Sequence, residues 1–365
     1  MRFDHSKRTF TKTLTAALVA VGLLATGLPG AAQAAEKTSF RIAWSIYVGW
    51  MPWAYASESG IMKKWADKYG IEVEIVQIND YIESINQYTA GAFDGCVMTN
   101  MDALTIPAAG GVDSTALIVG DFSNGNDGIV TKDSDSVKAL KGKNVNLVEL
   151  SVSHYLLARA LDSVGLAEKD LTVVNTSDAD IVSAFTSAPD VTSVVTWNPQ
   201  LAEVKKVKGA AAVFDSSQIP GEIIDMMVVN SETLAANPKL GKALTGAWYE
   251  IMGIMSSDTK EGKAARSMMA TAAGTDLAGY DFQLGTTKMF YTPAEAVTFT
   301  TSDQLPATMK KVSEFSFAHG LLGDGAPNAE VIGMTFPGGK TWGDAGNVKL
   351  RFDDSFMAMA KDGKL

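Results

Sequence analysis

The chain has 365 residues and a formal net charge of −10 at pH 7. This length predicts at least two domains, and the acidic balance argues against nucleic acid and anionic membranes as partners. The only cysteine, Cys96, cannot form an internal disulfide, and its apolar neighbours predict a small buried side chain.

Residues 1–34 have the three-part layout of a secretory signal peptide. Four basic residues, the last of them Lys12, precede an apolar stretch over 14–28, and Ala32-Gln33-Ala34 then gives a small-x-small cleavage pattern. The apolar stretch is shorter than the roughly 20 residues of a membrane-spanning helix. No cysteine follows it that could carry a lipid anchor. We expect export to the periplasm as a soluble chain with a net charge of −13, because the leader itself carries +3.

Short predicted strands then alternate with helices in two successive runs. The first run has strands over 40–44, 71–76, 95–98 and 115–119, with helices over 54–69, 81–90 and 103–109. The second has strands over 128–131, 144–148, 171–174, 191–196 and 211–214, with helices over 153–164, 179–187 and 201–206. This alternation predicts mainly parallel sheets with helices on both faces.

The last part of the chain is predicted to be mostly helical. A strand over 224–229 precedes helices over 231–234, 239–256, 260–273, 293–302 and 305–319, and the Gly-rich tail from Gly320 is predicted to be irregular. Crossings between the two halves are expected near 123–127 and 215–225. The sequence therefore predicts an α/β fold with two doubly wound lobes around a cleft and extra C-terminal helices. Lobe I is expected over 38–124 and 225–365, and lobe II over 125–224.

Ligand contacts are expected in the loops that follow the carboxyl ends of the strands. These loops contain no Lys or Arg but ten acidic residues: Asp80, Asp102, Asp121, Asp127, Glu149, Asp178, Asp180, Asp215, Glu222 and Asp225. They also carry the aromatic residues Tyr47, Trp50, Trp53, Tyr81, Phe122, Tyr155 and Trp197. Carboxylates and aromatic faces together suit a small planar cation, whereas an oxyanion is better bound by Arg or Lys.

Ten of these and neighbouring residues are the candidate ligand contacts. We expect walls from Trp50, Trp53 and Trp197, carboxylates from Asp102, Asp127 and Glu222, and further polar contacts from Asn100, Ser151, His154 and Asn198. Two alternatives stay open. Trp50 and Trp53 are spaced i, i+3 and could equally pack against the next helix, and Glu222 could serve at a hinge.

Several segments resemble the nitrate/taurine/sulfonate class of periplasmic binding proteins. They are 50–53 (WMPW), 58–60 (ESG), 90–95 (AGAFDG), 126–130 (NDGIV), 140–145 (LKGKNV), 153–157 (SHYLL) and 196–199 (TWNP). The resemblance implies the type II bilobal fold of that class. It also implies a solute-binding component of an ABC importer, a monomer that delivers its small-molecule ligand to membrane permease subunits.

A narrower resemblance concerns the ligand. The Trp-rich first loop and the segment 219–225 (IPGEIID) are similar to a subgroup linked to urea-carboxylase-like systems. This implies guanidine as the ligand, with urea or a related amide as the close alternative. A nitrate- or sulfonate-type anion is the further alternative that the parent class implies.

Enzymes of pyrimidine synthesis for thiamine use a related fold and rely on histidine and iron. Beyond residue 34 this chain has only His154 and His319, and neither lies in a metal-ligand spacing. The sequence also lacks a nucleophile–base motif, a phosphate loop and a Cys-x-x-Cys pair. It therefore predicts a binding protein without metal or cofactor, and not an enzyme.

Overall fold

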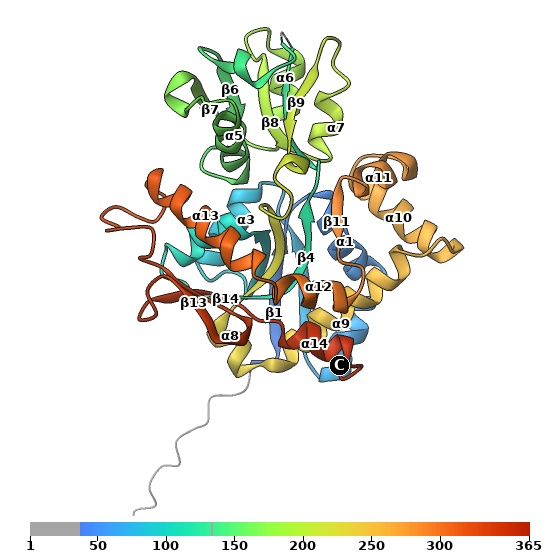
Figure 1. The fold of residues 1–365 in the computed structure, drawn as a ribbon. Helices are drawn as coiled ribbons and strands as arrows, with labels where there is room; N and C mark the ends of the chain where they lie inside the picture. Colours follow the sequence, from blue (N-terminus) through green and yellow to red (C-terminus); the bar gives the residue numbers. More distant parts are fainter. Residues whose placement is uncertain (1–36, 133) are drawn as a thin grey trace, which may run out of the picture. The chain divides into compact units, whose positions relative to one another are not determined.

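The computed structural model describes residues 37–132 and 134–365, in which two β-sheets are each flanked by helices (Figure 1). The predicted signal peptide lies outside the described residues. The larger sheet has the strand order β13-β12-β14-β4-β10-β3-β1-β2, with β11 paired to β4, and the smaller has the order β7-β6-β8-β5-β9. We call the larger sheet with its helices lobe I and the smaller one with its helices lobe II.

Lobe I contains most of the helices. Its strands are β1 (Ser39–Trp44), β2 (Glu72–Gln77), β3 (Gly95–Thr99), β4 (Ser114–Ser123), β10 (Ile224–Asn230), β11 (Thr287–Met289), β12 (Gly333–Phe336), β13 (Lys340–Trp342) and β14 (Val348–Phe352). Its helices are η1 (Val48–Trp50), α1 (Met51–Glu58), α2 (Ile61–Tyr69), α3 (Tyr81–Thr89), α4 (Asn100–Ala103), the π-helix η2 (Leu104–Ala108), α8 (Ser231–Ala236), α9 (Pro238–Met255), α10 (Lys260–Ala272), α11 (Leu277–Leu284), α12 (Pro293–Thr300), α13 (Gln304–Ala318), η6 (Pro337–Gly339) and α14 (Ser355–Lys361).

Lobe II is smaller. Its strands are β5 (Asp127–Thr131), β6 (Asn144–Leu147), β7 (Thr172–Asn175), β8 (Ser193–Trp197) and β9 (Ala211–Asp215). Its helices are η3 (Val137–Leu140), α5 (Val152–Ser163), η4 (Glu168–Asp170), α6 (Ile181–Ser187), α7 (Gln200–Val204) and, in the second crossing, η5 (Ser216–Gln218).

The two sheets repeat one strand pattern. The order β2-β1-β3-β10-β4 of lobe I corresponds to β7-β6-β8-β5-β9 of lobe II. In each lobe the first strand after a crossing, β5 or β10, is inserted antiparallel to both of its neighbours. The expectation of mainly parallel sheets therefore holds for β1–β4 and β6–β9 but not for β5 and β10. A strand that enters a sheet directly from the other lobe does not arrive through a helical crossover, which is the connection that parallel pairing needs.

The two crossings lie side by side and share hydrogen bonds. The Ser123 hydroxyl, at the end of β4, lies 2.6 Å from the hydroxyl of Ser216, at the start of η5. The Gly125 N–H also donates to the Ser216 hydroxyl, at 2.8 Å. The Asn126 side chain donates to Thr287 Oγ1 of β11, at 2.8 Å. These contacts fix the starts of β5 and β10, where buried acidic residues lie.

The C-terminal tail is more regular than expected. Strands β12 to β14 extend the lobe I sheet beyond β4, and α14 follows them. The segment that forms β14 alternates Val, Lys, Leu, Arg and Phe, which is the period-2 pattern of a half-buried strand and was overlooked among the tail glycines. Cys96 is buried and unpaired, as predicted. In the described part of the chain, no helix combines the length and the apolar character needed to cross a membrane.

Candidate functional site

A small cavity lies between the lobes at the carboxyl ends of several strands. Lobe I and the second crossing line it with Tyr47, Trp50, Tyr81, Thr99, Ile223 and Asp225, and lobe II with Asp127, Val152 and Trp197. The cavity leaves about 10 Å³ for the centre of a water-sized sphere, which is close to the space of one bound water. Lining residues from both lobes mean that separating the lobes would open this cavity.

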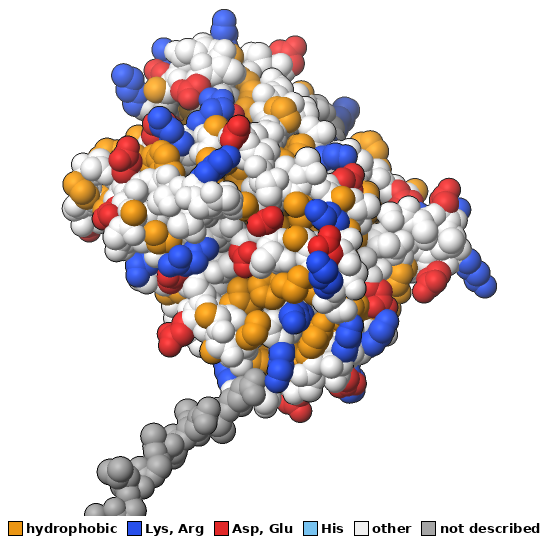
Figure 2. Space-filling model, turned by 60° about the horizontal axis from the view of Figure 1, so that its bottom comes forward, with side chains coloured by type: hydrophobic (Ala, Val, Ile, Leu, Met, Phe, Trp, Pro, Cys, Tyr) orange, Lys and Arg blue, Asp and Glu red, His pale blue; other side chains and the backbone are white. Residues whose placement is uncertain are grey.

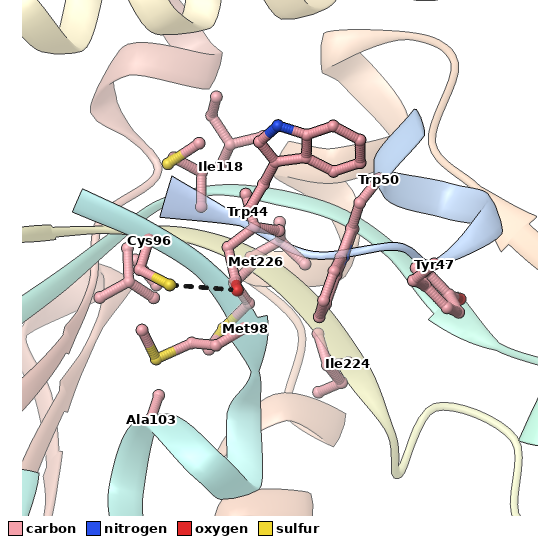
Figure 3. Close-up of a cluster of buried hydrophobic side chains, with 14 of the residues drawn as sticks. Trp44, Tyr47, Trp50, Cys96, Met98, Ala103, Ile118, Ile224 and Met226 are labelled. Atoms are coloured by element: carbon pink, nitrogen blue, oxygen red, sulfur yellow. Dashed lines mark hydrogen bonds between the residues drawn. The ribbon is translucent and has the colours of Figure 1, made fainter. Parts of the chain in front are cut away.

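Aromatic rings form much of the cavity wall. Trp50 packs edge-on against Tyr47 at 5.0 Å between ring centroids, and its ring lies 5.5 Å from that of Tyr81. From lobe II, the Trp197 ring meets Tyr81 at 5.6 Å in a T-shaped contact, and Trp197 Nε1 donates to the Ile46 carbonyl at 3.4 Å. Figure 3 shows Trp50 and Tyr47 beside the buried cluster that contains Ile224 and Met226.

Carboxyl groups are concentrated at and next to the cavity. Asp127 begins β5, and its Oδ2 accepts a 2.5 Å hydrogen bond from Ser123. Asp225 of β10 pairs in register with Asp121 of β4, so the two carboxyl groups lie on neighbouring strands. Tyr47 donates its hydroxyl proton to Asp121 Oδ1, at 3.1 Å. No Lys, Arg or His lines the cavity in the described part of the chain.

A fourth buried carboxyl group, that of Asp102, lies behind the wall. Its Oδ2 accepts hydrogen bonds from the Tyr81 hydroxyl, at 2.6 Å, and from Thr99 Oγ1, at 2.8 Å. Tyr81 and Thr99 both line the cavity, so Asp102 orients two wall residues. Asp102 also accepts from the backbone N–H of Val152, and the carboxyl groups of Asp121 and Asp225 share a hydrogen bond.

Burial makes the ionised forms of these acids unfavourable. Burial raises the pKa of Asp127 to about 7, and the nearby Asp102 adds to this effect. Burial also raises the pKa of Asp102 to about 6, although hydrogen bonds from Tyr81 and Thr99 oppose the shift. For Asp225, burial and the adjacent Asp121 raise the pKa well above the ordinary range. Bringing a positive charge into the cavity would reverse these effects, because it stabilises the ionised carboxylates.

The protein alone should lose stability as the pH rises from about 4 to about 7. Asp127 and Asp102 have folded-state pKa values above those of an unfolded chain, so each stabilises the fold only while it is protonated. This contribution to the free energy of unfolding is complete below about pH 4 and is lost as the pH rises through the folded-state pKa. Thermal melts across this range should show the decline, and Asp127→Asn should make it shallower. A wild-type melting temperature that rises steadily over this range, with the same rise in Asp127→Asn, would contradict the expectation.

The local sequence explains how the acidic and aromatic side chains come together at the cavity. Thr99 caps α4 by accepting a hydrogen bond from the Asp102 N–H, at 3.4 Å, and this places Asp102 directly after β3. In η1, a Cβ atom on Gly49 would lie 2.5 Å from the Tyr47 ring and 2.8 Å from Asp121 Oδ2. Glycine at position 49 therefore allows the first loop to approach the acidic group closely.

The structure brings four of the ten predicted contacts together. Trp50, Asp127 and Trp197 line the cavity, and Asp102 supports two of its wall residues. Trp53 instead packs in lobe I, where it is 1% exposed and stacks on Trp248 at 5.2 Å between ring centroids. The i, i+3 spacing thus separates the two tryptophans, with Trp50 on the cavity and Trp53 in the core.

The other five predicted contacts have partners outside the cavity. Asn100 bonds to the backbone of Glu222 and Ile224, and Ser151 caps α5 by accepting from the Ser153 N–H. The Asn198 carbonyl accepts from the Val48 N–H, and its side chain donates to Thr286.

His154 and Glu222 take part in ionic contacts away from the cavity. His154 Nε2 lies 2.7 Å from Glu168 Oε1. Glu222 accepts from Tyr155, Arg159 and Lys311. This set keeps the pKa of Glu222 low despite its burial, with Arg159 the largest favourable influence. Because two cations already neutralise it, Glu222 joins α5 to α13 instead of facing the cavity.

Sequence reasoning underrated six wall residues. Tyr47, Tyr81 and Asp225 belong to the acids and aromatics of the predicted loops but not to the ten candidate contacts. Thr99, Val152 and Ile223 lie in the same loops without a charge or an aromatic ring to mark them. The signal for Asp225 was its position just before the apolar run that forms β10, which corresponds to Asp127 before the run of β5. Asp127 is the first residue and Asp225 the second residue of the antiparallel strand that follows a crossing, and only the fold makes that equivalence visible.

Comparison with known proteins gives one family match and many structural ones. The sequence model of the family described as NMT1/THI5 like matches residues 57–252, more than half of the chain. No curated protein matches the sequence of this chain.

Three solved structures illustrate the structural likeness. One is the alkanesulfonate-binding protein SsuA from Xanthomonas axonopodis pv. citri bound to MOPS (18% identity, TM-score 0.65, covering 80% of this chain and 96% of that one). Another is a periplasmic sulfonate-binding protein of a putative sulfonate ABC transporter from Methylobacillus flagellatus KT (17%, 0.64, 90% and 95%). The third is the periplasmic nitrate-binding protein NrtA from Synechocystis PCC 6803 (14%, 0.57, 90% and 99%). These likenesses establish the two-lobed α/β fold expected from the sequence.

Proposed function

This chain belongs to the NMT1/THI5-like family, and we propose that it is the solute-binding component of an ABC importer. The proposal is supported by the fold that the chain shares with periplasmic nitrate- and sulfonate-binding proteins. It is also supported by the cavity between the lobes, since closing two lobes around a ligand is the usual mode of capture in such proteins. In this role the protein carries its ligand to permease subunits in the membrane.

We further propose that the ligand is a small planar cation of the guanidinium type. The observation that carries this proposal is the buried acid group, Asp121, Asp127 and Asp225, which has no Lys or Arg beside it in the described cavity lining. An uncompensated buried carboxylate is costly, and a bound cation offsets that cost. Guanidinium has N–H donors around its edge and no acceptor, which suits neighbouring buried carboxyl groups without a basic partner in the described cavity lining.

The aromatic wall supports the same ligand. Trp50, Tyr81 and Trp197 surround the cavity, and each ring face that meets a cation adds about 0.5–2 kcal/mol, depending on desolvation. A bound nitrate or sulfonate would instead lie among carboxylates without a compensating basic side chain, so anions are disfavoured.

Urea is the second candidate because its size and shape are close to those of guanidinium. It is neutral and carries one carbonyl acceptor, so it needs at least one donor from the cavity. Trp50 Nε1 is a buried donor without a partner among the described residues and favours this alternative. Charge separates the two candidates, since the acid group stabilises only the cation.

We propose a binding role and not catalysis. The cavity lining contains carboxyl, hydroxyl and aromatic groups, and it lacks a nucleophile paired with a histidine or lysine base among the described residues. The residual enzyme hypothesis, a pyrimidine-synthase-like activity on the same fold, predicts conversion of the bound compound. Recovery of unchanged ligand after prolonged incubation would exclude that hypothesis for the compound tested.

Export to the periplasm and a monomeric state complete the proposal. Export rests on the signal-peptide pattern in 1–34 and the periplasmic setting named for the structural relatives. On the lobe I face shown in Figure 2, acidic and basic side chains are interspersed with hydrophobic ones. This mixed face does not itself favour a partner of one charge.

Calorimetric titration of the chain from residue 35 with guanidinium, urea, nitrate and taurine tests the proposed ligand. We expect saturable 1:1 binding of guanidinium, weaker binding of urea, and no binding of nitrate or taurine. The bound ligand should also raise the melting temperature, because it binds only the folded state. Tight binding of nitrate or taurine without guanidinium or urea would contradict the ligand proposal.

A further inference from the structure

A second contact between the lobes lies at the facing sides of α5 and α13. The Tyr155 ring of α5 meets the Phe315 ring of α13 at 5.1 Å, with the ring planes perpendicular. The His319 ring, at the end of α13, stacks on Phe315 at 4.0 Å. Figure 1 shows α13 in orange approaching α5 in green from lobe I. This contact includes both histidines found beyond residue 34.

One carboxylate of lobe II joins these two histidines. Glu168, at the start of η4, places Oε1 2.7 Å from His154 Nε2 and Oε2 3.0 Å from His319 Nε2. His154 and Glu168 belong to lobe II, whereas His319 belongs to lobe I. The Glu168–His319 contact therefore exists only while the lobes are together.

The hydrogen bonds around each ring determine where its protons lie. His154 Nδ1 accepts from the Leu150 N–H at 3.1 Å, so the remaining ring proton lies on Nε2, which faces Glu168 Oε1 at 2.7 Å. His319 Nδ1 lies 2.8 Å from the Phe315 carbonyl, which can only accept, so this nitrogen must carry a proton. Its other nitrogen faces a carboxylate and must carry one too. His319 is therefore an imidazolium when the contact is made.

The same geometry disfavours a metal ion. His154, Glu168 and His319 offer ligand atoms within 4.8 Å of one another. A metal on His154 Nε2 would require the proton to move to Nδ1, which already faces the Leu150 N–H donor. Only two of the three side chains could then act as metal ligands, and a structural zinc site uses four.

We propose that His319, Glu168 and His154 form a proton-dependent latch, in which closure of the lobes takes up a proton on His319. The effect on ligand affinity rests on the proposed function, because it requires closure to accompany binding. Glu168 and the Phe315 carbonyl raise the pKa of His319, while burial opposes the shift. The raised pKa of His319 belongs to the closed form of the protein. The ion pair with Glu168 therefore stabilises closure fully at pH values below the ordinary histidine pKa. This stabilisation is lost as the pH rises through the pKa of His319 in the closed form.

Other charged groups also surround His319, and four of them are paired elsewhere. Lobe II contributes Arg159, Asp162 and Lys169, and α13 itself contributes Lys311 and Glu314. Arg159 and Lys311 bind Glu222, and Glu314 lies 3.8 Å from Lys310. The pH dependence that the latch adds is assigned to the His319–Glu168 contact, and it is separate from the titration of the cavity acids Asp102 and Asp127.

The first experiment measures the titration of the His319 ring directly and does not use ligand affinity as its readout. In the chain from residue 35, proton NMR should show two histidine rings, and His319→Gln identifies the His319 signal by its loss. We expect His319 to titrate above the ordinary value of about 6.5 in the protein saturated with guanidinium. Glu168→Gln should return it toward that value, whereas the control Glu314→Gln should leave it raised. An ordinary His319 titration both with and without guanidinium would overturn the latch.

The second experiment reads ligand affinity. Because the acid group of the cavity favours cation binding at higher pH, the latch is isolated as the ratio of Kd in His319→Gln to Kd in the wild type. We expect this ratio to be about threefold to tenfold at pH 5.5 and to approach one at pH 9. The ratio should persist in EDTA, and its loss there would indicate a metal and overturn the latch. If calorimetry shows no ligand binding but the His319 pKa is raised, the proposed function fails and the latch stands.

Discussion

The substitution Asp225→Asn should weaken guanidinium binding by about 10- to 150-fold, which corresponds to the loss of one charge-assisted hydrogen bond. Asp225 lines the cavity, is buried beside Asp121, and has no Lys or Arg next to it in the described cavity lining. Asparagine has nearly the same shape, so the cavity keeps its size while the negative charge is removed. Urea, which is neutral, should lose less than about threefold from the same change.

Two further measurements test whether Asp225 acts through its charge. Asp258→Asn removes the same charge from a side chain that is 93% exposed and far from the cavity lining, and it should leave the Kd unchanged. The ligand-free Asp225→Asn protein should be more stable than the wild type above pH 7, because it lacks one of three neighbouring buried acids. An equal loss of affinity for guanidinium and urea would show that Asp225 acts through shape and not through charge.

The substitution Trp53→Ala should lower the free energy of unfolding by about 3–5 kcal/mol, as is typical when a large aromatic side chain is removed from a core. Trp53 is 1% exposed and stacks on Trp248, and it does not line the cavity. Denaturant unfolding would measure the loss. The milder variant Trp53→Phe should show a smaller loss and keep the ligand affinity of the wild type.

Trp197→Phe provides the contrast within the same residue type. Trp197 lines the cavity from lobe II and touches Tyr81, so its replacement should raise the guanidinium Kd more than Trp53→Phe does. If the two variants changed affinity equally, the separation of cavity wall from core would be wrong.

Much of the fold was predictable because period-2 and period-3.6 patterns are local. The predicted strands of the first two thirds agree with the structure within a few residues, since most of these runs are bounded by Gly, Asp or Asn. The insertion of β5 and β10 antiparallel to their neighbours was not predictable, because pairing depends on how the chain crosses between lobes. Strand β14 alternates in the expected way but was hidden by the glycines that precede it.

The candidate site was predictable in its chemistry more than in its members. The loops that follow the strands contain acids and aromatics without Lys or Arg, and the cavity has the same character. Which acid faces the cavity depends on neutralising partners that are distant in sequence. Glu222 is 63 residues from Arg159 and 89 from Lys311, and both bind its carboxylate. Asp225, three positions further along, has no such cation in contact among the described residues and faces the cavity.

A crystal structure of the chain from residue 35 with guanidinium tests the central claim most directly. The ion should lie between Trp50 and Trp197, with its nitrogens about 2.7–2.9 Å from carboxylate oxygens of Asp127 and Asp225. Crystals grown with guanidinium and nitrate together should show the cation alone in this cavity. Nitrate in the cavity, or guanidinium bound only at the surface, would contradict the assignment of the buried acids to cation capture.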